Sequence, residues 1–73
     1  ALITVEGSEM VDGNTYSNAA LAEATGGIRI FANPLNRFLT SSEFTINPAG
    51  GFTIDLGVSF GAGDFFDVFL KYC

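Results

Sequence analysis

The stretch Phe52-Thr-Ile-Asp-Leu-Gly-Val-Ser-Phe60 places a large apolar side chain at every even position and a polar residue or glycine at every odd position. Because successive side chains of a β-strand point to opposite faces, this alternation predicts a strand about 30 Å long with one apolar and one polar face. Such a strand is typical of an antiparallel sheet that packs on one side only. The stretch therefore predicts a β-protein, and it contains no pattern of a catalytic or ligand site.

The segment before this stretch predicts its partner strand. Residues 43–47 also alternate, and Pro48-Ala-Gly-Gly51 between the two segments is a strong turn sequence. We expect a hairpin of 43–47 with 52–60, in which Phe44 and Ile46 share the buried face with the apolar residues of the second strand.

The last segment, residues 64–72, fits either a strand or a helix. As a helix capped by Asp64 it would gather its aromatic residues on one broad face. As a strand it places Phe65 and Phe69 on one face and a second apolar set on the other: Phe66, Val68, Leu70 and Tyr72. Its aromatic and β-branched content and the preceding Gly61-Ala-Gly63 turn favour the strand, so that 43–72 would form a meander.

One helix is predicted, at residues 18–25. Ser17 or Asn18 can cap its first N–H groups, the Ala-Ala-Leu-Ala-Glu interior has high helix propensity, and Gly26 is placed to end it. At about two turns it is too short to be stable alone, so we expect Leu21 to hold it against a sheet.

The expected fold is therefore mainly β: an antiparallel sheet of five or six strands, as a small sandwich or incomplete barrel, with the short helix near 18–25 packed on it. Residues 1–73 form a single domain. The β-branched run of residues 1–6 has apolar side chains on both faces and is expected to be an edge strand or a strand exchanged with another copy.

Composition favours association. A 73-residue chain buries only a little over ~60% of its unfolded surface, and small domains usually add disulfides, a metal or a partner. One cysteine and no histidine exclude an intrachain disulfide and a zinc cage. The chain is 48% hydrophobic, has eight Phe and is only 15% charged, which leaves packing against a second copy as the alternative to an efficient monomer core.

Charge and residue types argue against several function classes. A net charge of −5 with three basic residues does not fit binding to nucleic acid or to an anionic membrane surface. No stretch is apolar enough for membrane insertion as a helix. Without histidine, Ser-His-Asp and Cys-His catalysis are excluded, so we expect no enzymatic activity and no cofactor.

Two small features leave alternatives open. Glu9, Asp12 and Asn14 are weak calcium candidates because their hard oxygens surround Gly13, but the spacing is not that of an EF-hand, and a solvated turn is the favoured interpretation. Cys73 fits an intermolecular link, an inert thiol, or a disulfide partner cut off from a longer chain.

These features together predict a non-enzymatic, self-assembling structural subunit, most plausibly of an extracellular filament or pilus-like fibre. The chain begins at Ala1 rather than Met, which fits a processed, secreted or cell-surface product but also a fragment or simple removal of Met. The partner is another copy, bound through apolar faces and by strand addition, in which either residues 1–6 or residues 64–72 would complete a neighbour's sheet. The alternatives are a small monomeric β-domain that binds a ligand or protein, such as an adhesion module or bacteriocin-like peptide, or a capsid or coat subunit. The expected assembly interface comprises Leu2, Ile3, Val5, Phe65, Phe69 and Tyr72.

Overall fold

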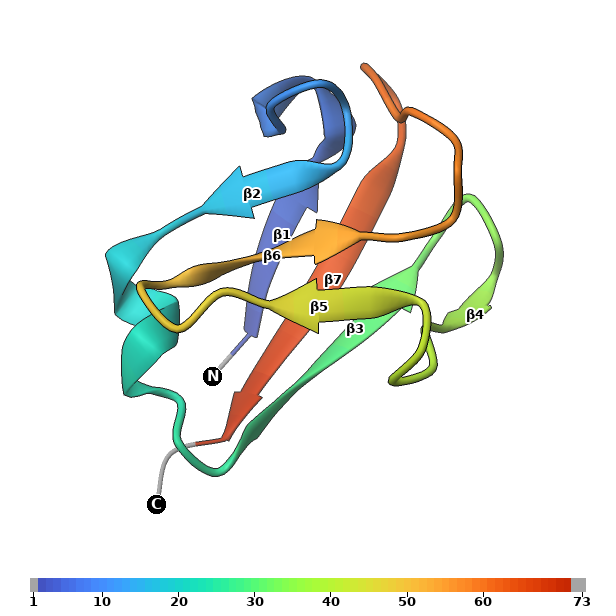
Figure 1. Cartoon of the computed structure of the whole chain (residues 1–73). Helices are drawn as coiled ribbons and strands as arrows, with labels where there is room; N and C mark the ends of the chain where they lie inside the picture. Colours follow the sequence, from blue (N-terminus) through green and yellow to red (C-terminus); the bar gives the residue numbers. More distant parts are fainter. Residues whose placement is uncertain (1, 72–73) are drawn as a thin grey trace.

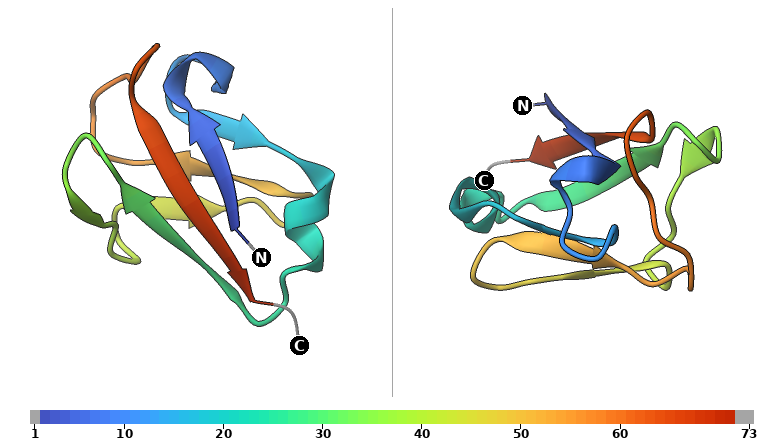
Figure 2. Two further views of the ribbon diagram at one scale, coloured as in Figure 1. Left: turned by 180° about the vertical axis from the view of Figure 1, so that it is seen from behind. Right: turned by 90° about the horizontal axis from the view of Figure 1, so that it is seen from above.

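Seven short strands form two antiparallel sheets, as a computed structural model of the protein shows for residues 2–71 (Figure 1). The larger sheet has four strands, in the order β1 (Leu2–Glu6), β7 (Phe65–Lys71), β3 (Gly27–Ala32) and β4 (Arg37–Phe38). The smaller sheet has three strands, in the order β2 (Thr15–Ser17), β6 (Gly51–Ile54) and β5 (Phe44–Ile46). The view from above in Figure 2 shows the two sheets as separate layers. The predicted mainly β class and small sandwich are confirmed, with seven strands instead of five or six.

The hydrophobic core lies between the two sheets. Alternate residues of β7 are buried and exposed, as expected for a strand with one face toward the core. The largest fully buried side chains come from both layers: Val5, Ile30, Phe52, Ile54, Phe66 and Val68. Of these, Phe66 contacts Phe60 edge to face, with 4.9 Å between ring centroids.

The ambiguous last segment is a strand and lies inside its sheet. β7 pairs with β1 on one side (Val5 opposite Phe66) and with β3 on the other (Ile30 opposite Val68). The hairpin of 43–47 with the following strand is also confirmed, with Phe44 opposite Ile54 and Ile46 opposite Phe52. Ile46 remains exposed because β5 is an edge strand of the smaller sheet.

The predicted long strand over 52–60 is wrong in its second half. β6 ends at Ile54, and Gly57 adopts a positive φ of 74°, which takes the chain out of the extended conformation. Residues 55–64 then cross from the smaller sheet to the larger one. The expected meander over 43–72 is therefore divided between two layers, and Val58 is exposed instead of buried.

The predicted helix is present but shorter than expected. Residues Ala19–Glu23 form a 3₁₀ helix, η2, whose cap Asn18 accepts a hydrogen bond from the Ala20 N–H at 3.0 Å. Buried Leu21 anchors it, as expected. The positive φ after it belongs to Gly27 rather than Gly26. A second 3₁₀ turn, η1 (Gly7–Glu9), connects β1 to the next loop and was not expected.

Candidate functional site

The most unusual surface of this protein is the side of the four-stranded sheet that faces away from the core. The strand register puts Leu2 and Phe69 opposite each other across β1 and β7, and Phe31 opposite Phe38 across β3 and β4. Phe65 lies two pleats before Phe69 on the same face of β7. Leu2, Phe65 and Phe69 are 55%, 43% and 40% exposed. We call this surface the outer face and define it by Leu2, Phe31, Phe38, Phe65 and Phe69.

Three of the four aromatic rings of the outer face contact one another through Phe38. Phe38 lies between Phe31, at 5.1 Å between centroids and nearly perpendicular, and Phe69, at 5.8 Å. The Arg29 guanidinium carbon lies 4.3 Å from the centroid of the Phe38 ring. Edge-to-face and cation–π geometries hold rings in defined orientations. The outer face is therefore an ordered aromatic surface, of the kind that interface cores use.

One carboxylate interrupts this surface. Asp67 lies on β7 between Phe65 and Phe69, and its two oxygens accept hydrogen bonds from the Thr4 hydroxyl at 3.3 Å and the Asn33 side-chain amide at 3.2 Å. Asn33 also donates to the Phe65 carbonyl at 3.1 Å. These bonds join three segments across the sheet and partly satisfy the charge.

The predicted interface residues divide into three groups. Leu2, Phe65 and Phe69 lie together on the outer face. Val5 is only 1% exposed and belongs to the core, and Ile3 packs against that core. Tyr72, like Cys73, lies outside the described residues. Sequence reasoning did not assign Phe31, Phe38 or Arg29 to this surface. The available signal was the alternation of residues 28–32, which puts Arg29 and Phe31 on one face of a strand.

The larger sheet also offers an open edge. Residues 1–6 and 64–72 were both expected to be able to pair with a neighbour's sheet, but β7 already has a strand on each side. β1 lies at the edge, and its sequence Leu-Ile-Thr-Val-Glu contains neither Lys nor Pro, the residues that commonly protect edge strands. β1 and the two-residue β4 are the edge strands of this sheet, and β1 is the longer of the two.

Two of the three weak calcium candidates accept hydrogen bonds from neighbouring residues. Glu9 Oε1 accepts a hydrogen bond from the Glu6 backbone N–H at 2.9 Å, and Asn14 Oδ1 accepts one from the Thr15 hydroxyl at 3.1 Å. Asp12 is exposed in the turn, with a φ of 55°. Within residues 2–71, no three His, Cys, Asp or Glu side chains are grouped as a metal site. The solvated-turn interpretation explains these contacts.

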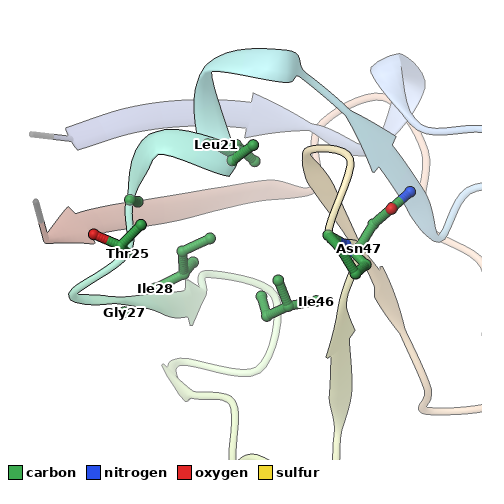
Figure 3. A pocket seen from close by; sticks show the side chains of 9 residues that line it. Leu21, Thr25, Gly27, Ile28, Ile46 and Asn47 are labelled. Carbon is green, nitrogen blue, oxygen red and sulfur yellow. The ribbon is translucent and has the colours of Figure 1, made fainter.

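Two small hollows lie at the end of the sandwich where β3 begins. The first, of about 160 Å³, lies between η2, the start of β3 and β5, with Leu21, Ile28 and Ile46 around it (Figure 3). The second, of about 200 Å³, is bordered by Arg29, Phe69 and Lys71. Both are smaller than the ~300–1,000 Å³ typical of small-molecule sites.

A bidentate ion pair closes the loop between β4 and β5. Arg37 donates from both terminal nitrogens to the Glu43 carboxylate at 2.6 Å. This contact, with the Thr40 backbone N–H as a second donor, lowers the pKa of Glu43 from 4.5 to about 2. It also accounts for one of the three cations of the chain.

This lowered pKa predicts an acid-sensitive contribution to stability. Because the folded pKa is below the unfolded one, the contribution is complete above pH 4.5 and is lost as the pH falls through about 2. We expect the melting temperature of the native protein to exceed that of Glu43→Gln at neutral pH, and the difference to shrink over this window. Thermal melts of both proteins at a series of pH values test this, and a difference independent of pH would contradict it.

No helix within residues 2–71 is long and apolar enough to cross a membrane. Comparison with protein-family models, curated proteins and solved structures finds no match to this chain. A functional interpretation therefore depends on the outer face and the β1 edge.

Proposed function

We propose that this protein is a non-enzymatic structural subunit that associates with copies of itself through the outer face. The observation that carries the proposal is the cluster of four Phe rings and Leu2 on one side of a sheet whose other side already forms the core. Apolar patches of this kind on small proteins usually mark an interaction surface. Aromatic residues dominate the binding energy of such surfaces.

The size of the protein supports this proposal. The sandwich measures 31 × 22 × 21 Å, so one face has a projected area of roughly 650 Å², close to the ~800 Å² that each partner of a stable complex buries. Burial of apolar surface at ~25 cal/mol per Å² would add substantially to the stability of a domain this small. Association would thus add apolar burial to that of the core within the single chain.

The β1 edge supplies a second contact, which a filament requires. A subunit with two different contact surfaces can bind one neighbour at each of them. If the symmetry operations that relate the neighbours do not close into a ring, the subunits form an open filament. Addition of another strand at β1 would satisfy its unpaired backbone groups. An extracellular filament or pilus-like fibre, with the protein secreted or at the cell surface, is the assembly we propose.

Other assignments use the same surface. A capsid or coat subunit would also associate through the outer face and would differ only in the closure of the assembly. A monomeric adhesion module or bacteriocin-like domain would present the outer face to a different protein. The small hollows favour a protein partner over a small molecule in either case.

Loss of the exposed rings should abolish association without unfolding the chain. We expect native protein to change from monomer to oligomer between about 1 µM and about 1 mM in sedimentation velocity, in reducing and in non-reducing buffer alike. Phe65→Ser/Phe69→Ser should remain monomeric over this range because the centre of the contact is lost.

The matched control is Ile46→Ser/Val58→Ser, which removes two exposed apolar side chains outside the larger sheet. This control should associate like the native chain. Native protein that stays monomeric at the highest concentration would contradict the proposal.

A further inference from the structure

The charges around the outer face are distributed unevenly along β7. At the start of β7, the loop 60–64, η1 and the turn after η1 come together: the Gly7 N–H donates to the Asp64 carbonyl at 2.8 Å, and the Phe60 N–H donates to the Gly13 carbonyl at 2.9 Å. These segments form what we call the acidic end, which carries four carboxylates: Glu6, Glu9, Asp12 and Asp64. No Lys or Arg lies in residues 1–28 or 38–70, so none accompanies them in these segments.

Two carboxylates of the acidic end, Glu6 and Asp64, are held by hydrogen bonds within it. Glu6 accepts hydrogen bonds from the Ser8 hydroxyl at 2.7 Å and the Gly63 N–H at 3.0 Å, and these bonds lower its pKa. Asp64 accepts from the Gly61 N–H at 3.0 Å. Each carboxylate retains acceptor capacity for a further cation, since an ionised carboxylate offers about four lone-pair sites.

The end of β7 has the opposite character. Gly27, which has no side chain, lies opposite Lys71, and the larger hollow of about 200 Å³ opens beside it. Arg29, Phe69 and Lys71 all border this hollow. Of the three basic side chains, only Arg37 forms an ion pair within residues 2–71. Arg29 and Lys71 therefore have no carboxylate partner in this part of the chain. We call this region the basic hollow. The neighbouring helix η2 contributes one carboxylate, Glu23.

The two ends are separated along the same strand. From Phe65 to Lys71, β7 advances about 20 Å at ~3.4 Å per residue, and the aromatic rings of the outer face occupy the interval. A surface that is acidic at one end, mainly aromatic with the hydrogen-bonded Asp67 in the middle, and basic at the other end is complementary to a second copy turned by 180° about an axis that lies in the plane of the outer face and is perpendicular to β7. Such a rotation also satisfies the self-complementarity that a two-fold contact requires.

We propose that two copies pack outer face to outer face with their β7 strands antiparallel, so that the acidic end of each copy covers the basic hollow of the other. This inference rests on the proposed function and specifies its contact. The aromatic rings form the centre of the interface, and the four charge clusters form its rim. The hollow is the size of one or two side chains, which fits carboxylate side chains of the partner better than a free ligand. Rim charges of this kind select the orientation of the partner and raise the association rate.

The first test removes the positive charge. Arg29→Ser/Lys71→Ser should weaken self-association about tenfold or more in sedimentation velocity at low salt. Ser41→Glu/Ala49→Glu carries the same formal net charge but alters exposed residues outside the strands and outside the hollow. This control should associate nearly as tightly as the native chain. Equal weakening of both variants would mean that net charge alone matters, and would overturn the inference.

The second test exchanges the charges. The variant Arg29→Glu/Lys71→Glu is acidic at both ends of the outer face. The variant Glu9→Lys/Asp12→Asn has fewer carboxylates at its acidic end and a new cation there. Each variant alone should remain largely monomeric. Mixed in equal amounts, the two variants should form a heterodimer. The acidic end of the first variant faces the intact basic hollow of the second variant, and the hollow of the first variant, now acidic, faces the new Lys of the second. Circular dichroism melts of each variant establish that it is folded.

The outcomes separate this inference from the proposal it rests on. Recovery of a dimer in the mixture, weakened by added salt, supports the antiparallel contact. Association of all variants like the native chain overturns the charge-directed contact and leaves self-association in place. Failure of the folded variants to associate when mixed overturns the two-fold arrangement. Native protein that never associates overturns both.

Discussion

Replacement of Phe66 by Ala should lower the free energy of unfolding by about 3–5 kcal/mol, a large part of the stability of this domain. Phe66 is completely buried at the centre of β7, the strand with partners on both sides, and its ring packs edge to face on Phe60. Truncation of such a ring costs about 3–5 kcal/mol, because it loses apolar burial and leaves a cavity. A domain of this length is expected to be stable by only about 4–11 kcal/mol. Urea unfolding followed by circular dichroism measures the loss.

The adjacent residue provides the control for this prediction. Phe65→Ala removes the same side chain one position earlier, where the pleat turns it to the outer face. We expect this variant to lose at most about 1 kcal/mol of monomer stability, since its ring is already partly exposed. Equal destabilisation by the two substitutions would contradict the assignment of the two faces of β7.

Replacement of Gly51 by Ala should be the most damaging single change outside the large core residues. Gly51 begins β6 at a φ of 125°, a conformation that L side chains rarely adopt, and a Cβ there would collide with the Tyr16 carbonyl oxygen of the paired strand β2. Backbone strain and steric overlap each cost roughly 1–3 kcal/mol, so we expect a loss of about 2–5 kcal/mol.

The matched glycine for this test is Gly61. A Cβ at Gly61 meets no atom within 4 Å, and its φ is not positive. Gly61→Ala should therefore change the free energy of unfolding little, or raise it slightly by reducing the freedom of the unfolded chain. A thermal melt of both variants beside the native protein is sufficient. If Gly51→Ala melts at the native temperature, the pairing of β2 with β6 is not as described.

The alternation of apolar and polar residues correctly predicted the strands that have one face toward the core and one face away from it. The hairpin of Phe44–Ile46 with Gly51–Ile54 and the strand Phe65–Lys71 follow from a period of two that is visible in the sequence. The same alternation gave a wrong prediction after Ile54, where the strand ends. Gly57 lies at an odd position of the pattern, and a glycine there fits the polar face of a continued strand. Alternation does not reveal that its backbone turns to positive φ there.

The outer face could be predicted only in part, because it is assembled by long-range pairing. Phe65 and Phe69 follow from the pleat of one strand. Phe31 and Phe38 join them only because β3 pairs with β7 across a sequence separation of about 40 residues, which no local pattern indicates. Val5 was assigned to the interface because its strand has apolar residues on both faces. Only the position of β1 beneath the smaller sheet shows which of these faces is buried.

The most direct test of the association surface is a dilution series followed by NMR. With the protein labelled and assigned, amide and aromatic-ring signals are recorded from about 1 mM down to about 10 µM. The proposal predicts that signals of Phe31, Phe38, Phe65 and Phe69 shift or broaden with concentration, while those of Val58 and the exposed edge of the smaller sheet stay constant. Signals that are independent of concentration throughout, or that change on the smaller sheet instead, would contradict self-association through the outer face.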